Sequence, residues 1–254
     1  MADAMHGFSA RELRTLRSLK TPAGVQRLLN ALSYHDADTA WSPRRVLREG
    51  TGHCLEGGIL AAAALRAIGH PPLILDLEGE KDDDHIIAVY RERGHWGAVS
   101  KSHFNGLRER PPIFRTLREL ALTYFEDYYN GRGERTLRRY SRPIDLSRFD
   151  HLDWMTTERP IWFVPRYLVE EAKHIPLISR AQAKSLVRLD RLSIQAGLIG
   201  YDHSHMFANG KSIYAELAHT DPRTNGPKRS ATASKDNGAA ELYARPPRSR
   251  SKPT

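Results

Sequence analysis

One long and almost uncharged segment, residues 54–68, limits what this chain can fold into more than any other feature. Its sequence is CLEGGILAAAALRAI, which contains four consecutive alanines and only two charged residues, Glu56 and Arg66. A helix that is apolar on nearly every side has to be buried. Gly69 and the two prolines that soon follow it end the helix, because glycine permits a left-handed turn and proline cannot continue a helix. The sequence therefore predicts a fold built around one buried helix.

Three short strand patterns follow this helix. Residues 73–75 form an apolar run, residues 85–90 are rich in β-branched side chains, and residues 95–99 form a third run after a polar turn at Gly94. Such runs predict strands, and the short turn between the second and third predicts a hairpin. A buried helix beside a small antiparallel sheet gives an α+β fold class.

Apolar residues also recur at helical spacing on both sides of this core. They predict further helices at residues 9–19, 25–34, 114–129 and 179–198. We therefore expect four regions. They are an N-terminal helical segment (1–40), a core (41–130), a C-terminal helical extension packed on the core (131–208) and a disordered basic tail (209–254).

The positive charge of the chain is concentrated in the tail. The formal net charge of the 254 residues is +9, and residues 209–254 hold nine Lys and Arg against four Asp and Glu, a net charge of +5. The tail has few large apolar residues to offset the entropy of ordering. It could contact RNA or another anionic partner weakly. The charge of the remaining chain does not indicate a nucleic-acid-binding protein.

The composition also bears on location. No apolar run approaches the roughly 20 residues needed to cross a bilayer, and the first 20 residues lack the apolar stretch of an export signal. We expect a cytoplasmic protein that does not associate with membranes.

No cofactor and no metal site are expected. Cys54 is the only cysteine, which excludes an internal disulfide and an all-cysteine metal site. The acidic residues 82–84 lack the glycine and distal glutamate of a calcium-binding loop. His203 and His205 alternate like metal ligands beside Asp202, but without a distant fourth ligand they are only a weak indication of a metal site.

Cys54 stands at the start of the buried helix, where a thiol can become a nucleophile. The unpaired N–H groups and the positive end of the helix dipole lower the pKa of a thiol at this position. Gly52 permits a sharp turn into the helix, and the Cys54 backbone N–H could donate to a developing oxyanion. His85 is the candidate base, because the hairpin order returns its strand beside the first turn of the helix.

The order of these motifs resembles the transglutaminase-like superfamily, whose core is similar to that of papain-like cysteine proteases. The resemblance covers roughly residues 43–105 and rests on GHCLE at 52–56, the alanine-rich helix, Asp84-His85 and Gly94-His95-Trp96. In that superfamily a cysteine attacks an acyl group, a histidine transfers the proton, and an aspartate or asparagine orients the histidine. The resemblance implies that Cys54 is the nucleophile and His85 the general base.

The third member of the predicted triad departs from the pattern. Members of the superfamily usually carry aspartate a few residues after the aromatic residue of the last strand, and four residues after Trp96 the chain has Ser100. A serine hydroxyl can accept a hydrogen bond from imidazole but stabilises an imidazolium less than a carboxylate does. Asp84 cannot easily substitute, because neighbours on a strand point to opposite faces. The predicted catalytic residues are thus Cys54, His85 and Ser100, with activity weak, differently supported or lost.

Two functions follow. The first is a cysteine-dependent acyl-transfer enzyme of the peptidase or amidase type, which acts on a peptide or protein substrate through a thioester. The alternative is a catalytically impaired transglutaminase-like module that binds a peptide or protein partner. Residue types close to the pair in sequence predict an aromatic and polar cleft formed by Trp41, His53, His95 and Trp96.

Overall fold

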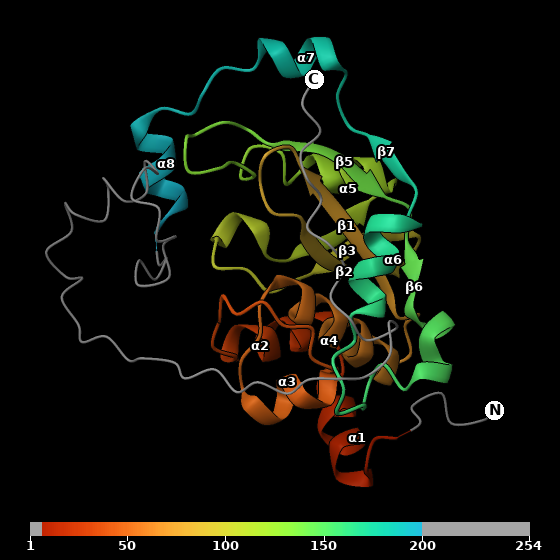
Figure 1. The fold of residues 1–254 in the computed structure, drawn as a ribbon. Helices are drawn as coiled ribbons and strands as arrows, with labels where there is room; N and C mark the ends of the chain where they lie inside the picture. The colour runs from red at the N-terminus through yellow and green to blue at the C-terminus, as the bar shows by residue number, and fades with distance from the viewer. Residues whose placement is uncertain (1–6, 200–254) are drawn as a thin grey trace, which may run out of the picture.

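One antiparallel sheet organises the fold of residues 7–199, the part of the chain that the computed structural model describes (Figure 1). Its seven strands follow the order β4-β3-β2-β1-β5-β7, and β6 also pairs with β1. The strands are β1 (Leu73–Gly79), β2 (His85–Glu92), β3 (His95–Val99), β4 (Arg110–Phe114), β5 (Leu137–Ser141), β6 (Ile144–Asp145) and β7 (His174–Pro176).

Helices cover this sheet and extend beyond it. They are α1 (Ala10–Arg17), α2 (Pro22–Ala31), α3 (Pro43–Glu49), α4 (Cys54–Ala67), α5 (Leu117–Leu122), α6 (Phe163–Glu170), α7 (Arg180–Ser185) and α8 (Arg191–Gly197), with 3-10 helices at Asn105–Leu107 and Leu146–Leu152. Several begin with a capping side chain. The hydroxyl of Thr21, for example, accepts from the Gly24 N–H at the start of α2, which satisfies one of the unpaired donors of the first turn.

The central prediction from the sequence is confirmed. The fold class is α+β with a small antiparallel sheet, and α4 begins at Cys54 with every residue from Glu56 to Leu65 buried. The predicted hairpin joins β2 to β3, where Val89 pairs with Ala98. Gly94 has a φ of 84° in the turn, a left-handed conformation that favours glycine.

The C-terminal half differs from its predicted helices. Within residues 114–129, only α5 is helical, and β4 ends where that helix was expected to begin. Residues 131–208 were expected to form a helical extension, yet they contribute β5, β6 and β7 to the same sheet. The helix predicted for residues 179–198 is two short helices. The basic tail, residues 209–254, and the His203 and His205 pair lie outside the described residues.

The sheet separates two apolar clusters. Ile86 and Ala88 of β2 belong to the cluster that contains α4, whereas Ile87 and Val89 belong to the cluster that contains Leu120 of α5. This alternation follows from the two-residue period of a strand. Consequently, the parity of a residue number on β2 determines which face its side chain occupies.

Helix α4 lies unusually close to β2. A Cβ atom added to Gly58 would be 2.8 Å from Cγ2 of Ile86 and 2.9 Å from its backbone oxygen. Real Cβ contacts are essentially never that short, so only glycine fits without displacing β2. The first turn of α4 is therefore held against the start of the strand that begins with His85.

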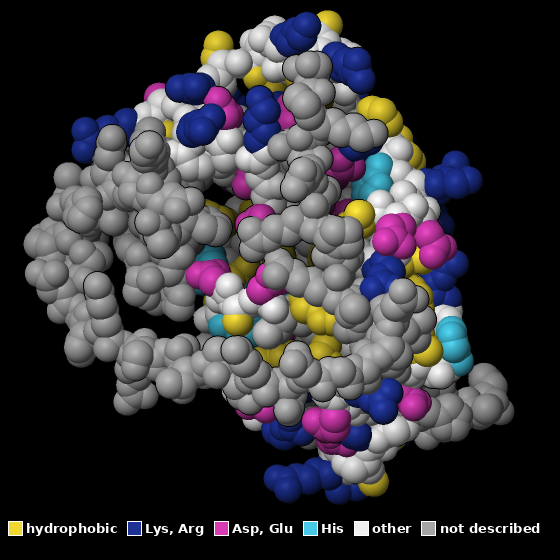
Figure 2. Space-filling model, viewed as in Figure 1, with side chains coloured by type: hydrophobic (Ala, Val, Ile, Leu, Met, Phe, Trp, Pro, Cys, Tyr) yellow, Lys and Arg dark blue, Asp and Glu magenta, His cyan; other side chains and the backbone are white. Residues whose placement is uncertain are grey.

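Exposed Lys and Arg side chains surround α7 and α8. Within residues 7–199, no helix is long and apolar enough to cross a bilayer. On the face seen in Figure 2, Lys and Arg side chains gather near α7 and also lie at the opposite end of the molecule, and Asp and Glu side chains are distributed between and beside them. Arg180, Lys184, Arg188 and Arg191 are exposed in and around α7 and α8.

Candidate functional site

Cys54 is the first residue of α4 and is partly exposed. The preceding residue, His53, has extended backbone angles, so the chain turns into the helix at this point. The Cys54 sulfur lies 3.8 Å from the backbone oxygen of Asp84. The thiol is therefore placed at the first turn of α4, beside the residue that precedes β2.

His85 begins β2 and is only 5% exposed. Its ring nitrogen Nε2 is 2.9 Å from the backbone oxygen of Leu107. A carbonyl oxygen only accepts hydrogen bonds, so Nε2 carries the proton and Nδ1 has the free lone pair. Burial lowers the pKa of His85 to about 4. At neutral pH the imidazole is thus uncharged, and Nδ1 is the nitrogen able to accept a proton.

Ser100 has a different relation to His85 from the expected one. It is fully buried, and its hydroxyl donates to the same Leu107 oxygen at 2.6 Å. We expected the hydroxyl to accept a hydrogen bond from the ring. Instead, the His85 ring N–H and the Ser100 hydroxyl both donate hydrogen bonds to the backbone oxygen of Leu107. Ser100 helps to hold the carbonyl that fixes the His85 tautomer.

No hydrogen bond joins the Cys54 thiol to the His85 imidazole in the described part of the chain: the thiol contacts the Asp84 oxygen and the ring contacts the Leu107 oxygen. His85 pairs with Leu77 across the sheet, and Leu77 belongs to the apolar cluster on the α5 side. Its ring therefore shares the face of Ile87, whereas α4 packs over Ile86. Contact between thiol and ring requires the thiol to reach around the start of β2.

Tyr34 is a neighbour of the thiol that no pattern in the sequence indicates. Burial raises the pKa of the Tyr34 hydroxyl, the Cys54 thiol raises it further, and the Cys54 backbone N–H lowers it. The hydroxyl thus lies beside the N–H expected to stabilise an oxyanion. The His103 ring packs on Tyr34, with centroids 3.5 Å apart. Because Tyr34 follows α2 in an irregular segment, no periodic pattern in the sequence indicates its position.

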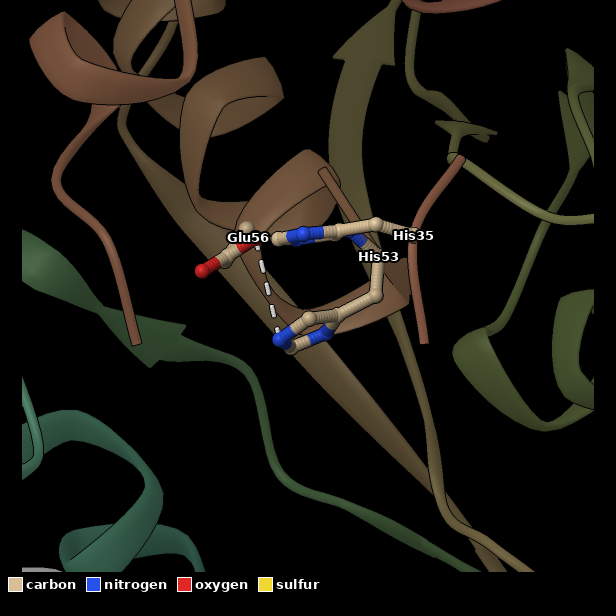
Figure 3. Close-up of side chains that lie close together, drawn as sticks. All are labelled: His35, His53 and Glu56. Carbon is tan, nitrogen blue, oxygen red and sulfur yellow. Dashed lines mark hydrogen bonds and ion pairs between the residues drawn. The ribbon is translucent and has the colours of Figure 1, made fainter. Parts of the chain in front are cut away.

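Two histidines and a glutamate form a compact group at the same end of α4 (Figure 3). The far ends of the His35 and His53 rings point toward the Glu56 carboxylate, and the ring centroids are 5.5 Å apart. Oε2 of Glu56 is 2.8 Å from Nε2 of His35 and 3.7 Å from Nε2 of His53. The side chain of Glu56 is fully buried.

The other oxygen of Glu56 anchors the preceding loop. Oε1 accepts from the Thr39 hydroxyl at 2.7 Å and from the Trp41 N–H at 2.8 Å. Burial by itself would raise the pKa of Glu56. The hydrogen bond with His35, the charge interaction with His53 and then the hydrogen bonds from Thr39 and Trp41 outweigh burial and lower this pKa. Glu56 therefore fixes the loop that carries Tyr34 and His35 against the first turn of α4.

A second group of carboxylates lies on β1 and at the start of β2. Nε2 of His174 is 2.9 Å from Oδ2 of Asp76, whose other oxygen is buried without a hydrogen-bond partner in the described residues. Desolvation, the Asp76 carboxylate and then Glu78 raise the pKa of Asp84 to about 7, with the Gly79 N–H opposing the shift. Both ring nitrogens of His174 are engaged, because Nδ1 contacts the Ala172 oxygen, so this ring has no free nitrogen for Cys54.

The predicted aromatic cleft is only partly assembled. Trp41 packs on His35 at 4.7 Å between ring centroids, so Trp41 and His53 belong to the group near Cys54. Trp96 and His95 begin β3, next to the hairpin turn, and so lie at the opposite end of β2 from His85. A cavity of about 220 Å³ lies elsewhere, between Thr136 of the β5 side and Val187 beyond α7.

Comparisons with known proteins do not assign the chain to a family. No family model matches the sequence, and no curated protein matches it.

Proposed function

We propose that this protein is a cysteine-dependent acyl-transfer enzyme of the peptidase or amidase type, with Cys54 as nucleophile and His85 as general base on a transglutaminase-like, papain-type core. The observation that carries the proposal is the position of the Cys54 sulfur, 3.8 Å from the backbone of the residue before His85. The buried helix, the order of the strands and the partly exposed thiol are consistent with it.

The proposed reaction begins with a neutral thiol and a neutral imidazole. Because the pKa of His85 is about 4, a stable thiolate and imidazolium pair does not form at neutral pH. The thiol instead transfers its proton to Nδ1 of His85 as the sulfur attacks the acyl carbon. The amine leaves with that proton and a thioester remains, which water hydrolyses with His85 again accepting a proton.

The surroundings supply a donor for the transition state. The Cys54 N–H points out of the first turn of α4 and can donate to the developing oxyanion. The Tyr34 hydroxyl lies beside this N–H, so an acyl oxygen would take the place of the Tyr34 hydroxyl or share the site with it. Glu56 positions the loop that carries Tyr34.

The test is acylation by an activated ester. Mixing the protein with p-nitrophenyl acetate should release a burst of about one equivalent of p-nitrophenolate, and Cys54→Ala should abolish it. His85→Ala should slow the burst by about 100-fold, the lower range for general acid–base catalysis. His95→Ala, at the far end of the same hairpin, is the matched control and should acylate at the wild-type rate. Equal burst rates for wild type and His85→Ala would refute the proposed role of His85.

A binding module is the second candidate, because the His85 ring is almost completely buried and bound to a carbonyl rather than to the thiol. This function predicts no burst with any activated ester. It also predicts that Cys54→Ala binds peptides from a random library as tightly as wild type does. A burst that depends on both Cys54 and His85 would exclude it.

A further inference from the structure

His35, His53 and Glu56 form a group at the start of α4 in which no Lys or Arg among the described residues neutralises the negative charge of the Glu56 carboxylate. Within residues 7–199, the ion-pair partners of Glu56 are His35 and His53, and no Lys or Arg forms an ion pair with it. A carboxylate that is fully buried is costly unless a positive partner compensates it. The balancing charge must come from a protonated imidazole or from a bound cation.

The three side chains have the composition and spacing of a metal site. The ligand atoms offered by His35, His53 and Glu56 all lie within 4.8 Å of one another. Zinc with nitrogen and oxygen ligands at about 2.0–2.1 Å has neighbouring ligand atoms about 3.3 Å apart. The distances from Oε2 of Glu56 to Nε2 of His35 and of His53, 2.8 Å and 3.7 Å, lie on either side of that value. A metal ion would change each of these two separations by about half an ångström.

A fourth oxygen is close to the same point. Nε2 of His53 is 2.9 Å from the backbone oxygen of Thr39. When His53 coordinates a metal through Nε2, its ring proton moves to Nδ1, and the Thr39 oxygen loses this hydrogen bond. That oxygen or a water molecule can then occupy the fourth position of a tetrahedral site.

We propose that His35, His53 and Glu56 form a binding site for a divalent transition metal ion such as Zn²⁺. Imidazole and carboxylate are ligands that zinc accepts readily. The ion would join the loop before α3 to the first turn of α4 and neutralise the buried Glu56. The site adjoins the proposed acyl-transfer site, because the Cys54 thiol interacts with the His53 side chain as well as with the Asp84 backbone, but Cys54 is not one of the proposed ligands.

The experiment is a zinc titration of the full chain after treatment with EDTA, followed by calorimetry in the presence of a competing chelator. Wild type should bind one equivalent at this site. His35→Gln, which keeps a donor for Glu56 in a partly exposed position, should weaken binding by about 100-fold or more, since even groups behind the ligands contribute 10- to 100-fold. Replacing zinc by Co²⁺ should give visible absorption bands that this variant lacks.

Three controls separate this site from others. Cys54→Ala should retain the zinc affinity of wild type, so failure of the acyl-transfer proposal would leave this result unchanged. His151→Gln, at an exposed position, and the double variant His203→Gln and His205→Gln should also bind as wild type does. Unchanged affinity in His35→Gln, or loss of binding only in the His203 and His205 variant, would overturn the proposal. Glu56→Gln tests the third ligand, with its far-ultraviolet circular dichroism checked for folding.

Discussion

His85 and His174 are both the first residue of a strand of the sheet, but their environments have opposite effects on their charge. His85 is bound to a neutral carbonyl, and burial lowers its pKa to about 4. His174 is bound to the Asp76 carboxylate, which raises its pKa. The comparison shows that complete burial lowers the pKa of His85 although a carbonyl oxygen opposes the shift, whereas a carboxylate partner outweighs the partial burial of His174.

The largest expected effect is the acid sensitivity caused by His85. Its pKa falls from an ordinary 6.5 to about 4 on folding, so the unfolded chain binds the proton more tightly. Stability should be fully present above pH 6.5 and fall by about 3 kcal/mol as the pH is lowered to 4. Urea unfolding at several pH values measures this slope. In His85→Gln this loss of about 3 kcal/mol between pH 6.5 and pH 4 should be absent, and an unchanged loss would show that folding does not lower the pKa of His85.

The opposite pH dependence is expected at His174. Because Asp76 raises its pKa, this pair stabilises the fold below pH 6.5, and the contribution is lost as the pH rises through the folded pKa. Asp76→Asn should therefore cost about 2 kcal/mol near pH 6, the size of a hydrogen bond to a charged group. The difference from wild type should narrow toward pH 8. Titration of His174 by NMR should show a lower pKa in the variant, and an unaltered pKa would break the comparison.

A smaller effect tests the carbonyl shared by His85 and Ser100. Ser100→Ala removes the hydroxyl that donates to Leu107 at 2.6 Å, while the imidazole continues to satisfy that oxygen. Thermal or urea unfolding should show a loss of about 1 kcal/mol. The pH slope assigned to His85 should remain. A much flatter slope in this variant would mean that Ser100 itself fixes the protonation of the ring.

The smallest effect is expected at Glu78. Its carboxylate lies 3.9 Å from Nε2 of His174, is partly exposed and also pairs with Arg139. Solvent screens such interactions, so Glu78→Gln should change stability by about 0.5 kcal/mol or less at pH 6. A loss as large as that of Asp76→Asn would show that the charge of His174 depends on both carboxylates together.

The elements that the sequence predicts correctly are those with the clearest apolar patterns. The apolar segment from Cys54 and the hairpin of β2 and β3 have patterns that admit few alternatives, and the structure has both. Strand β5, LRRYS, was missed because two of its five residues are arginines. Its arginines form ion pairs with Glu78 and Glu80 of the neighbouring segment, so long-range pairing rather than local pattern makes it a strand.

The candidate site was predictable only where its residues lie on regular elements. Cys54 and His85 begin α4 and β2, and the order of elements alone brings these positions near each other. Tyr34 and His35 lie in an irregular loop that Glu56 holds in place, so their approach to α4 depends on tertiary hydrogen bonds. A spacing of three between His53 and Glu56 at a helix start was the available signal, but the third member is 18 residues upstream.

The absence of a side chain at Gly58 restricts the positions that the Cys54 thiol can adopt. Since the helix backbone almost touches Ile86, a shift of the helix that put Ile59 in the place of Gly58 would bring a larger side chain into the same space. The position of the Cys54 sulfur along β2 is thus determined by how closely α4 packs against the strand at Gly58 and not by the length of the loops on either side. Insertions in those loops would alter access to the sulfur and leave its anchoring point in place.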